Sequence, residues 1–186
     1  MQPPEDEDGP PGETEKKPVK RRKGLGTLAY FLLKLFIVLV LGALTFTFVL
    51  GVHIQNGMSM YPHIKDGDLL ITYKLDSYAA GDVVLYRDPD TGERRISRIK
   101  VKGDNEIDIT DSGELLVNGA VVETDHYYST MRVSEGGIEY PYQVSGDGIF
   151  LLNDYRNSAR DSRLFGQFLE EDLLGKVVYV FRRRGI

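Results

Sequence analysis

A serine in a methionine-rich turn is the residue of this chain best suited to chemistry. The turn follows a long apolar run within a few residues and reads Gly57-Met58-Ser59-Met60-Tyr61-Pro62. A serine hydroxyl becomes a nucleophile when a neighbouring base takes its proton. Gly57 permits a tight backbone and Pro62 fixes the turn. Met58 and Met60 would present adaptable apolar surface to a substrate or to lipid. The pattern predicts that Ser59 is a nucleophile held at a membrane surface.

The composition excludes several other kinds of site. The chain has no cysteine, so disulfides, thiol nucleophiles and thiolate metal sites are ruled out. The histidines His53, His63 and His126 form no ligand-spaced cluster, and we expect neither a metal nor a cofactor. The net charge of -5 argues against a partner of nucleic acid, because nucleic-acid binders are usually basic.

The elements that must position Ser59 begin with an apolar segment. Residues 35–52 carry no charge over 18 residues, and residues 27–33 extend this run. The combined length is enough to cross a bilayer core of about 30 Å. Basic residues within 16–23 precede the run and predict that the N-terminus lies in the cytoplasm. We therefore expect a membrane anchor at 25–54.

Two alternatives to a retained anchor are a cleaved signal peptide and a buried core helix. The apolar run is longer than the core of a usual signal peptide, and no clean small-x-small cleavage site follows it. A buried core helix would need a second element to cover so uniform a surface, and the sequence offers none nearby. Residues 1–24 are rich in proline and charge, which predicts a disordered cytoplasmic tail.

The rest of the chain, 55–186, is predicted to be a mainly β, extracytoplasmic domain. Short β-rich segments separated by turn signals lie at 69–73, 82–86, 95–101, 106–109, 115–117, 149–152 and 176–181. Asn118-Gly119, followed by 120–122, is a strong signal for a two-residue hairpin. Only 165–174 suggests a short helix. The spacing favours antiparallel strands.

Four motifs, in order after the apolar run, resemble those of the type I signal peptidase family. The turn around Ser59 resembles the family's serine motif, in which the serine attacks the scissile carbonyl. Gly81-Asp82-Val83-Val84 resembles its Gly-Asp-Val-Val strand. Ser97-Arg98-Ile99, ending at Gly103-Asp104, resembles its motif of Lys-Arg, apolar residues and Gly-Asp.

The last motif of that family is Gly-Asp-Asn-Arg-x-x-Ser-x-Asp-Ser-Arg. Residues 153–163 resemble it and match at Asp154, Arg156, Asp161, Ser162 and Arg163. The resemblance covers 27–186. It implies an antiparallel β-rich signal-peptidase-like domain after a single transmembrane helix, with precursor proteins carrying signal peptides as ligands. It also implies a salt bridge between Asp161 and Arg163 that braces the site.

The residues that would activate Ser59 are replaced. In the family a lysine of lowered pKa acts as the general base. The best register places Ser97 at that position, because Arg98 then matches the following arginine. The serine that orients the lysine in the family corresponds here to Ala159. Asn153 stands where the family has glycine, and we expect it to narrow the floor of the site.

Two residues are candidates for a substitute base. Side chains alternate across a strand, so Lys100 would point away from the face of Ser97 in a regular strand. A one-residue bulge would be needed to bring Lys100 round. His63 lies four residues after Ser59, but a lone histidine in a turn is usually solvated.

Three functions follow as hypotheses. The first is a membrane-bound serine endopeptidase that removes signal peptides with an unusual base. The second is an inactive homologue that binds precursors and assists their assembly. It resembles the signal-peptidase-like proteins associated with pilus building in Gram-positive bacteria, which implies pilin subunits as ligands. The third is a self-cleaving repressor-type protease, against which the anchor and the lack of a DNA-binding domain argue.

Overall fold

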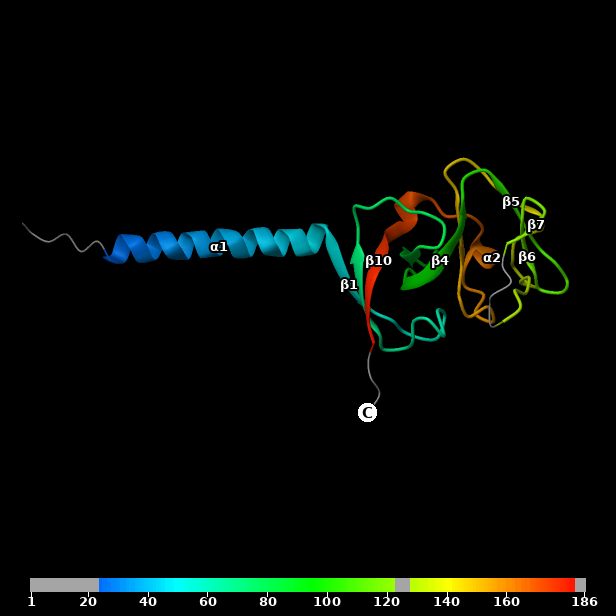
Figure 1. The fold of residues 1–186 in the computed structure, drawn as a ribbon, viewed down its shortest axis with the longest axis horizontal. Coiled ribbons are helices and arrows are strands. Elements are labelled where there is room, and N and C mark those ends of the chain that lie inside the picture. The colour runs from blue at the N-terminus through cyan, green and yellow to red at the C-terminus, as the bar shows by residue number, and fades with distance from the viewer. Residues whose placement is uncertain (1–23, 123–127, 183–186) are drawn as a thin grey trace, which may run out of the picture. The chain divides into compact units, whose positions relative to one another are not determined.

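The computed structural model describes residues 24–122 and 128–182 (Figure 1). The predicted tail, 1–24, lies outside this part of the chain except for Gly24. The first element is a long helix, α1, Gly24–Phe48. Its segment Gly26–Phe48 has a mean hydropathy of 2.4, and none of its most apolar stretch is buried. The segment is long and apolar enough to cross a membrane. The predicted apolar N-terminal helix is thereby confirmed.

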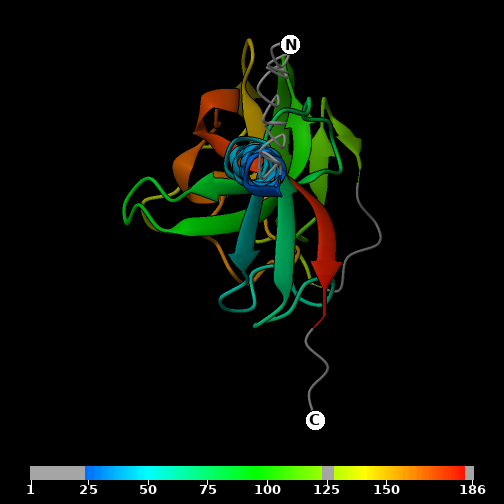
Figure 2. The same cartoon turned by 90° about the vertical axis from the view of Figure 1, so that its left-hand side faces the viewer.

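The main sheet has six strands, and all of its neighbouring pairs are antiparallel. In spatial order they are β1 Leu50–Ile54, β2 Leu69–Tyr73, β10 Leu173–Phe181, β3 Val83–Arg87, β4 Arg94–Lys102 and β9 Ile149–Leu152. Figure 2 shows β10, in red, running beside strands from the first half of the chain. The antiparallel β-rich fold predicted from the strand spacing is therefore confirmed.

A second, four-stranded sheet follows β4 along the chain. Its spatial order is β7 Ala120–Val121, β6 Leu115–Val117, β5 Asn105–Ile109 and β8 Tyr142–Val144. Asn118 and Gly119 join β6 to β7 with φ angles of 51° and 76°, as the two-residue hairpin signal predicts. This sheet carries none of the residues on which the site depends.

Strand β4 contributes to three separate hydrophobic clusters. Ile96 packs with Met60 and Leu85, Ile99 packs with residues of β3 and β9, and Val101 packs with the second sheet. The pairing of β4 with β9 shifts register between Ile99 and Val101, which places Lys100 at a bulge. Strand β4, which carries Ser97 and Arg98, is thus held by hydrophobic packing on both of its faces.

Two expectations differ from the structure. The segment 165–174 is not a helix, because α2 covers only Ser162–Phe165 and ends at Gly166, whose φ is 76°. A 3₁₀ turn, η1, follows at Glu170–Asp172, and β10 begins directly after it. Residues 50–54, which the sequence placed in the anchor, form β1 and pair with β2. The uncharged run continues from helix into strand, so hydropathy alone does not locate this boundary.

Gly175 is expected to be needed for β10 to lie between β2 and β3. Its φ is 149°, and an added Cβ would lie 3.0 Å from the carbonyl oxygen of Tyr73. Gly175→Ala should therefore lower the free energy of unfolding by about 1–3 kcal/mol. Urea unfolding of the full chain in detergent, followed by tyrosine fluorescence, measures this change.

The control is Val178→Ala, because Val178 is exposed on the same strand. That variant should change the free energy of unfolding by less than about 1 kcal/mol. Equal stability of Gly175→Ala and the wild type would contradict the steric argument.

Candidate active site

The turn that carries Ser59 lies between β1 and β2 and is fixed by its own backbone. The N–H of Gly57, whose φ is 83°, donates to Asp66 Oδ1 at 2.6 Å. The N–H of Tyr61 donates to the carbonyl of Met58 at 3.0 Å. Ser59 is half-buried, and its carbonyl accepts a hydrogen bond from the N–H of Tyr155 at 2.9 Å. The first and last motifs therefore meet at Ser59.

The apolar neighbours of Ser59 have different surroundings. Met60 is completely buried and packs with Ile64, Leu70, Leu85 and Ile96. Met60 therefore anchors the turn to the core, whereas the sequence argument expected it to offer surface. Met58 is 48% exposed, and Pro62, which follows a cis peptide bond, is half-buried. Met58 is the methionine available to a ligand.

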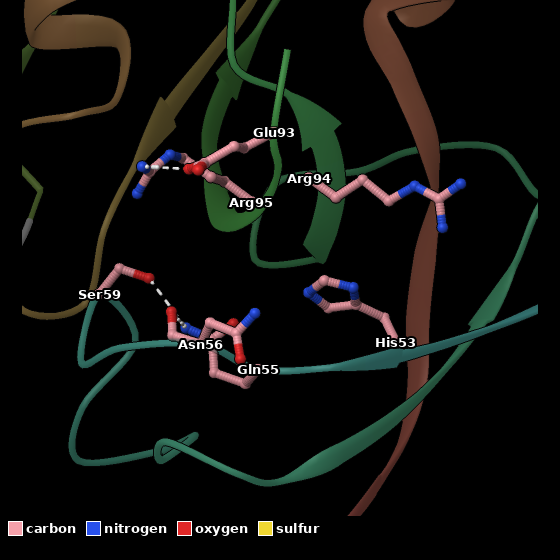
Figure 3. A pocket seen from close by; sticks show the side chains of 7 residues that line it. All are labelled: His53, Gln55, Asn56, Ser59, Glu93, Arg94 and Arg95. Atoms are coloured by element: carbon pink, nitrogen blue, oxygen red, sulfur yellow. Dashed lines mark hydrogen bonds and ion pairs between the residues drawn. The ribbon is translucent and has the colours of Figure 1, made fainter. Parts of the chain in front are cut away.

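Ser59 lines a cleft of about 430 Å³ (Figure 3). The cleft lies between the end of β1 with the turn after it and the start of β4. Its lining residues are His53, Gln55, Asn56, Ser59, Glu93, Arg94 and Arg95. The side chain of Ser59 accepts a hydrogen bond from Gln55 Nε2 at 3.2 Å. No lysine lines the cleft in the part of the chain that the structure describes.

Ser97 is engaged away from Ser59. Its side chain is completely buried, and its hydroxyl donates to Asn153 Oδ1 at 3.0 Å. The amide nitrogen of Asn153 donates in turn to the carbonyls of Ser158 and Arg160, at 3.1 and 3.3 Å. The amide of Asn153 therefore occupies the space between Ser97 and the backbone on either side of Ala159. A lysine side chain at position 97 would have to displace it.

Arg98 and Asp154 connect the four motifs. The guanidinium of Arg98 donates to both carboxylate oxygens of Asp154, at 2.8 and 2.6 Å, and to the carbonyl of Gly81 at 2.8 Å. Asp154 Oδ2 also lies 3.0 Å from Nδ1 of His63. The carboxylate of Asp154 is thus the partner that the structure gives to the ring of His63, the histidine considered as a substitute base.

Lys100, the other candidate base, lies at the bulge between Ile99 and Val101. The bulge that the sequence argument requires is present in β4. Lys100 is half-buried, but it is not among the residues that line the cleft around Ser59.

Asp161 and Arg163 form a completely buried ion pair. Arg163 donates to both carboxylate oxygens, at 2.9 and 2.8 Å. Its guanidinium also donates to the carbonyls of Arg156 and Ser158, at 2.7 and 2.6 Å. The carboxylate accepts from the backbone N–H of Asn153 at 3.0 Å. The pair thus holds the whole loop that presents the last motif.

Sequence reasoning identified none of the residues that line the cleft except Ser59, and the three missed residues that bear most on its chemistry are His53, Gln55 and Arg94. They belong to no motif, and the strand β1 that precedes the turn is hidden in the uncharged run. Burial, and to a smaller extent the charge of Arg94, lower the pKa of His53 below its ordinary value. The imidazole of His53, which lines the same cleft as Ser59, is therefore favoured in its neutral form. Only the position of His53 and Gln55 just before the serine turn could have pointed to them.

Residues 28–182 match the family described as signal peptidase, peptidase S26. Signal peptidase I of Leptolyngbya laminosa is 26% identical over 159 residues, which are 79% of this chain and 75% of that protein. The inactive signal peptidase IA of Staphylococcus aureus is 25% identical over 156 residues, which are 79% of this chain and 87% of that protein.

A solved structure was also found. The crystal structure of a signal peptidase I from Enterococcus faecalis V583 is 19% identical and has a TM-score of 0.43. The match covers 56% of this chain and 99% of that one.

Removal of Arg163 is expected to destabilise the chain strongly. Arg163→Met leaves the carboxylate of Asp161 buried without its counter-charge, which should cost about 3–5 kcal/mol of unfolding free energy. The matched control is Lys102→Met, since Lys102 pairs with Glu170 at the surface and should contribute less than about 1 kcal/mol. Urea unfolding in detergent measures both. Equal costs for the two variants would overturn the bracing role of Arg163.

Proposed function

Because this chain belongs to the signal peptidase family, peptidase S26, we propose that it binds signal-peptide-bearing precursors at the Ser59 cleft without cleaving them by a serine–lysine mechanism. The observation that carries the proposal is the hydrogen bond from Ser97 to Asn153. Both side chains are neutral and buried, and the motif resemblance assigns the family's base to position 97.

The chemical argument rests on the need for a base. A serine hydroxyl is a weak nucleophile until a neighbouring group accepts its proton. Ser97 carries no basic group, and Ser59 receives a hydrogen bond from an amide, Gln55 Nε2, which is no base either. Loss of one member of a nucleophile–base pair typically lowers the rate by several orders of magnitude. In this proposal Ser59 lines the binding cleft without acting as a nucleophile.

The argument for binding rests on strand edges. Strand β1 is an edge strand of the main sheet, and the pairing of β4 with β9 begins at Arg98. The first residues of β4 are therefore paired on one side only, with β3. Backbone of an extended precursor segment would pair with such edges by β-addition. The exposed Met58 would contact its apolar part.

The same proposal includes location and ligands. We place α1 across the cell membrane as a single-pass anchor, with the basic residues within 16–23 on the cytoplasmic side and 55–186 outside. Membrane lipid then surrounds α1. Pilin subunits are included among the precursors, on the strength of the resemblance to pilus-associated homologues.

An active peptidase with an unusual base is the second candidate. It is favoured by the retention of Ser59 and by the protonation state of one histidine, His53. The imidazole lines the same cleft, and its lowered pKa favours the neutral form that a general base requires. In that case the proton of Ser59 would pass to a ring nitrogen of His53.

Binding and cleavage are separated by one pair of assays. A preprotein with a small-x-small site is incubated with the full chain in detergent and with Ser59→Ala. We expect equal dissociation constants by fluorescence anisotropy and no cleavage above the buffer rate on gels, because no group activates the serine.

Cleavage by the wild type but not by Ser59→Ala would contradict this result and establish a peptidase. His53→Gln then tests the second candidate, since loss of a histidine base would remove cleavage while leaving binding unchanged. Absence of binding by a folded chain would contradict precursor recognition itself.

A family-type site is expected to need three changes together. Ser97→Lys supplies the base, Asn153→Gly clears the space that the amide fills, and Ala159→Ser supplies the hydroxyl that orients the lysine. The triple variant should cleave the preprotein about 10²-fold or more faster than the same variant with Ser59→Ala.

Ser97→Lys alone should stay inert and lose stability, because the lysine would meet the buried amide of Asn153. A triple variant that binds the preprotein but does not cleave it would show that the register at Ser97 is wrong.

A further inference from the structure

A second cavity adjoins the Ser59 cleft. It measures about 370 Å³ and shares Arg94 with the cleft. Its lining residues are Gly51, Val52, Thr72, Lys74, Leu85, Arg94, Leu173 and Leu174. In Figure 3 the side chain of Arg94 extends past His53 and away from Ser59. Arg94 therefore stands between the two spaces, and a ligand that fills both must pass it.

Most charges of the Ser59 cleft are compensated within the protein. Arg95 lies 2.8 Å from Glu93 and 2.8 Å from Asp88. Asp88 is buried and also accepts two hydrogen bonds from Arg160, each of 2.7 Å. These hydrogen bonds, chiefly those of Arg160, hold the pKa of Asp88 well below its usual range. Arg95 and Glu93 are therefore poorly available to a ligand.

Arg94 and Lys74 differ from Arg95 and Glu93 in how their charges are compensated. Across residues 24–122 and 128–182, Arg94 has no ion pair with a carboxylate, and it is exposed at the start of β4. Lys74 donates to a neutral acceptor, the carbonyl of Thr47, at 2.8 Å. Thr72 lines the same cavity, and its buried hydroxyl has no hydrogen-bond partner among the residues that the structure describes. Within the described part of the chain, the second cavity is thus lined by two cations without a carboxylate partner, a hydroxyl without a hydrogen bond and several leucine side chains.

We propose that Arg94, supported by Lys74, selects precursors that carry an acidic side chain in the segment lying next to Ser59. A carboxylate would pair with the guanidinium in a bidentate manner, and the leucine walls would hold an adjacent apolar residue. We take a peptide as the occupant because Arg94 lines both spaces, so that an extended segment bound at Ser59 lies within reach of the cavity. This inference rests on the proposed function, because it assigns a preference to the same cleft.

The test uses the full chain in detergent micelles without anionic lipid, and three fluorescein-labelled peptides. The peptides are identical leader segments with Glu, Ala or Lys at a single position scanned across the residues before the small-x-small site. Anisotropy titrations at low and high salt give the dissociation constants. At the position that meets Arg94, the Glu peptide should bind about 3–10-fold more tightly than the Ala peptide, and the Lys peptide more weakly.

Charge reversal supplies the decisive comparison. Arg94→Glu should invert the order so that the Lys peptide binds best, and high salt should weaken the preference in both proteins. The control is Lys102→Glu, which makes the same change of charge sign at the other end of β4 and should leave the order unchanged. An order that changes equally in Lys102→Glu would overturn the proposal in favour of a general surface field.

The remaining outcomes separate the two proposals. Equal binding of all three peptides at every scanned position overturns the acidic preference while precursor binding stands. Failure of every peptide to bind overturns precursor binding. Displacement of the Glu peptide by micelles containing phosphatidylglycerol, with no effect of phosphatidylcholine, would assign the cations to an anionic lipid headgroup and overturn the peptide assignment.

Discussion

The buried ion pair of Asp161 and Arg163 is the constraint on which the site depends. Two charges removed from water are costly unless every remaining donor and acceptor is satisfied. Here the carboxylate accepts from the backbone of Asn153, and the guanidinium donates to the carbonyls of Arg156 and Ser158. The pair converts a loop without regular structure into a rigid frame. That frame in turn presents Asn153, Asp154 and Tyr155 to β4 and to the serine turn.

The same frame is compatible with the replacement of the family's base that we propose at position 97. The hydroxyl of Ser97, the amide of Asn153 and the carbonyls of Ser158 and Arg160 are joined by hydrogen bonds. Each of these buried polar groups therefore has a partner. A lysine and its orienting serine are therefore not required for stability at this place. Asp154 and Arg98 still tie the motifs together, because their role is geometric. The proposed loss of the base therefore does not require a change in the scaffold.

The sequence predicts the strands well because their signals are local. Alternating apolar residues, and the Asn118-Gly119 turn, require no knowledge of distant contacts. The sequence-based prediction fails where contact with a residue distant in the chain determines the local structure. Residues 50–54 are a strand because β2 pairs with them, and Met60 is in the core because Leu70, Leu85 and Ile96 enclose it. A helix at 165–174 is likewise prevented by the end of α2 at Gly166 and by the bridge between Phe168 and Ile149.

The residues of the candidate site were likewise predictable only where their signals are local in the sequence. Short motifs identify Ser59, Ser97 and Asp154, since their spacing is recorded in the chain itself. The charge of the cleft comes from Arg94, which matters only because β4 places it opposite β1. A cation that holds a carboxylate equally in the ground and transition states lowers a dissociation constant without raising a turnover rate. Such a group suits a protein that retains its ligand, so the charge of Arg94 and the proposed replacement of the base favour the same function by separate physical routes.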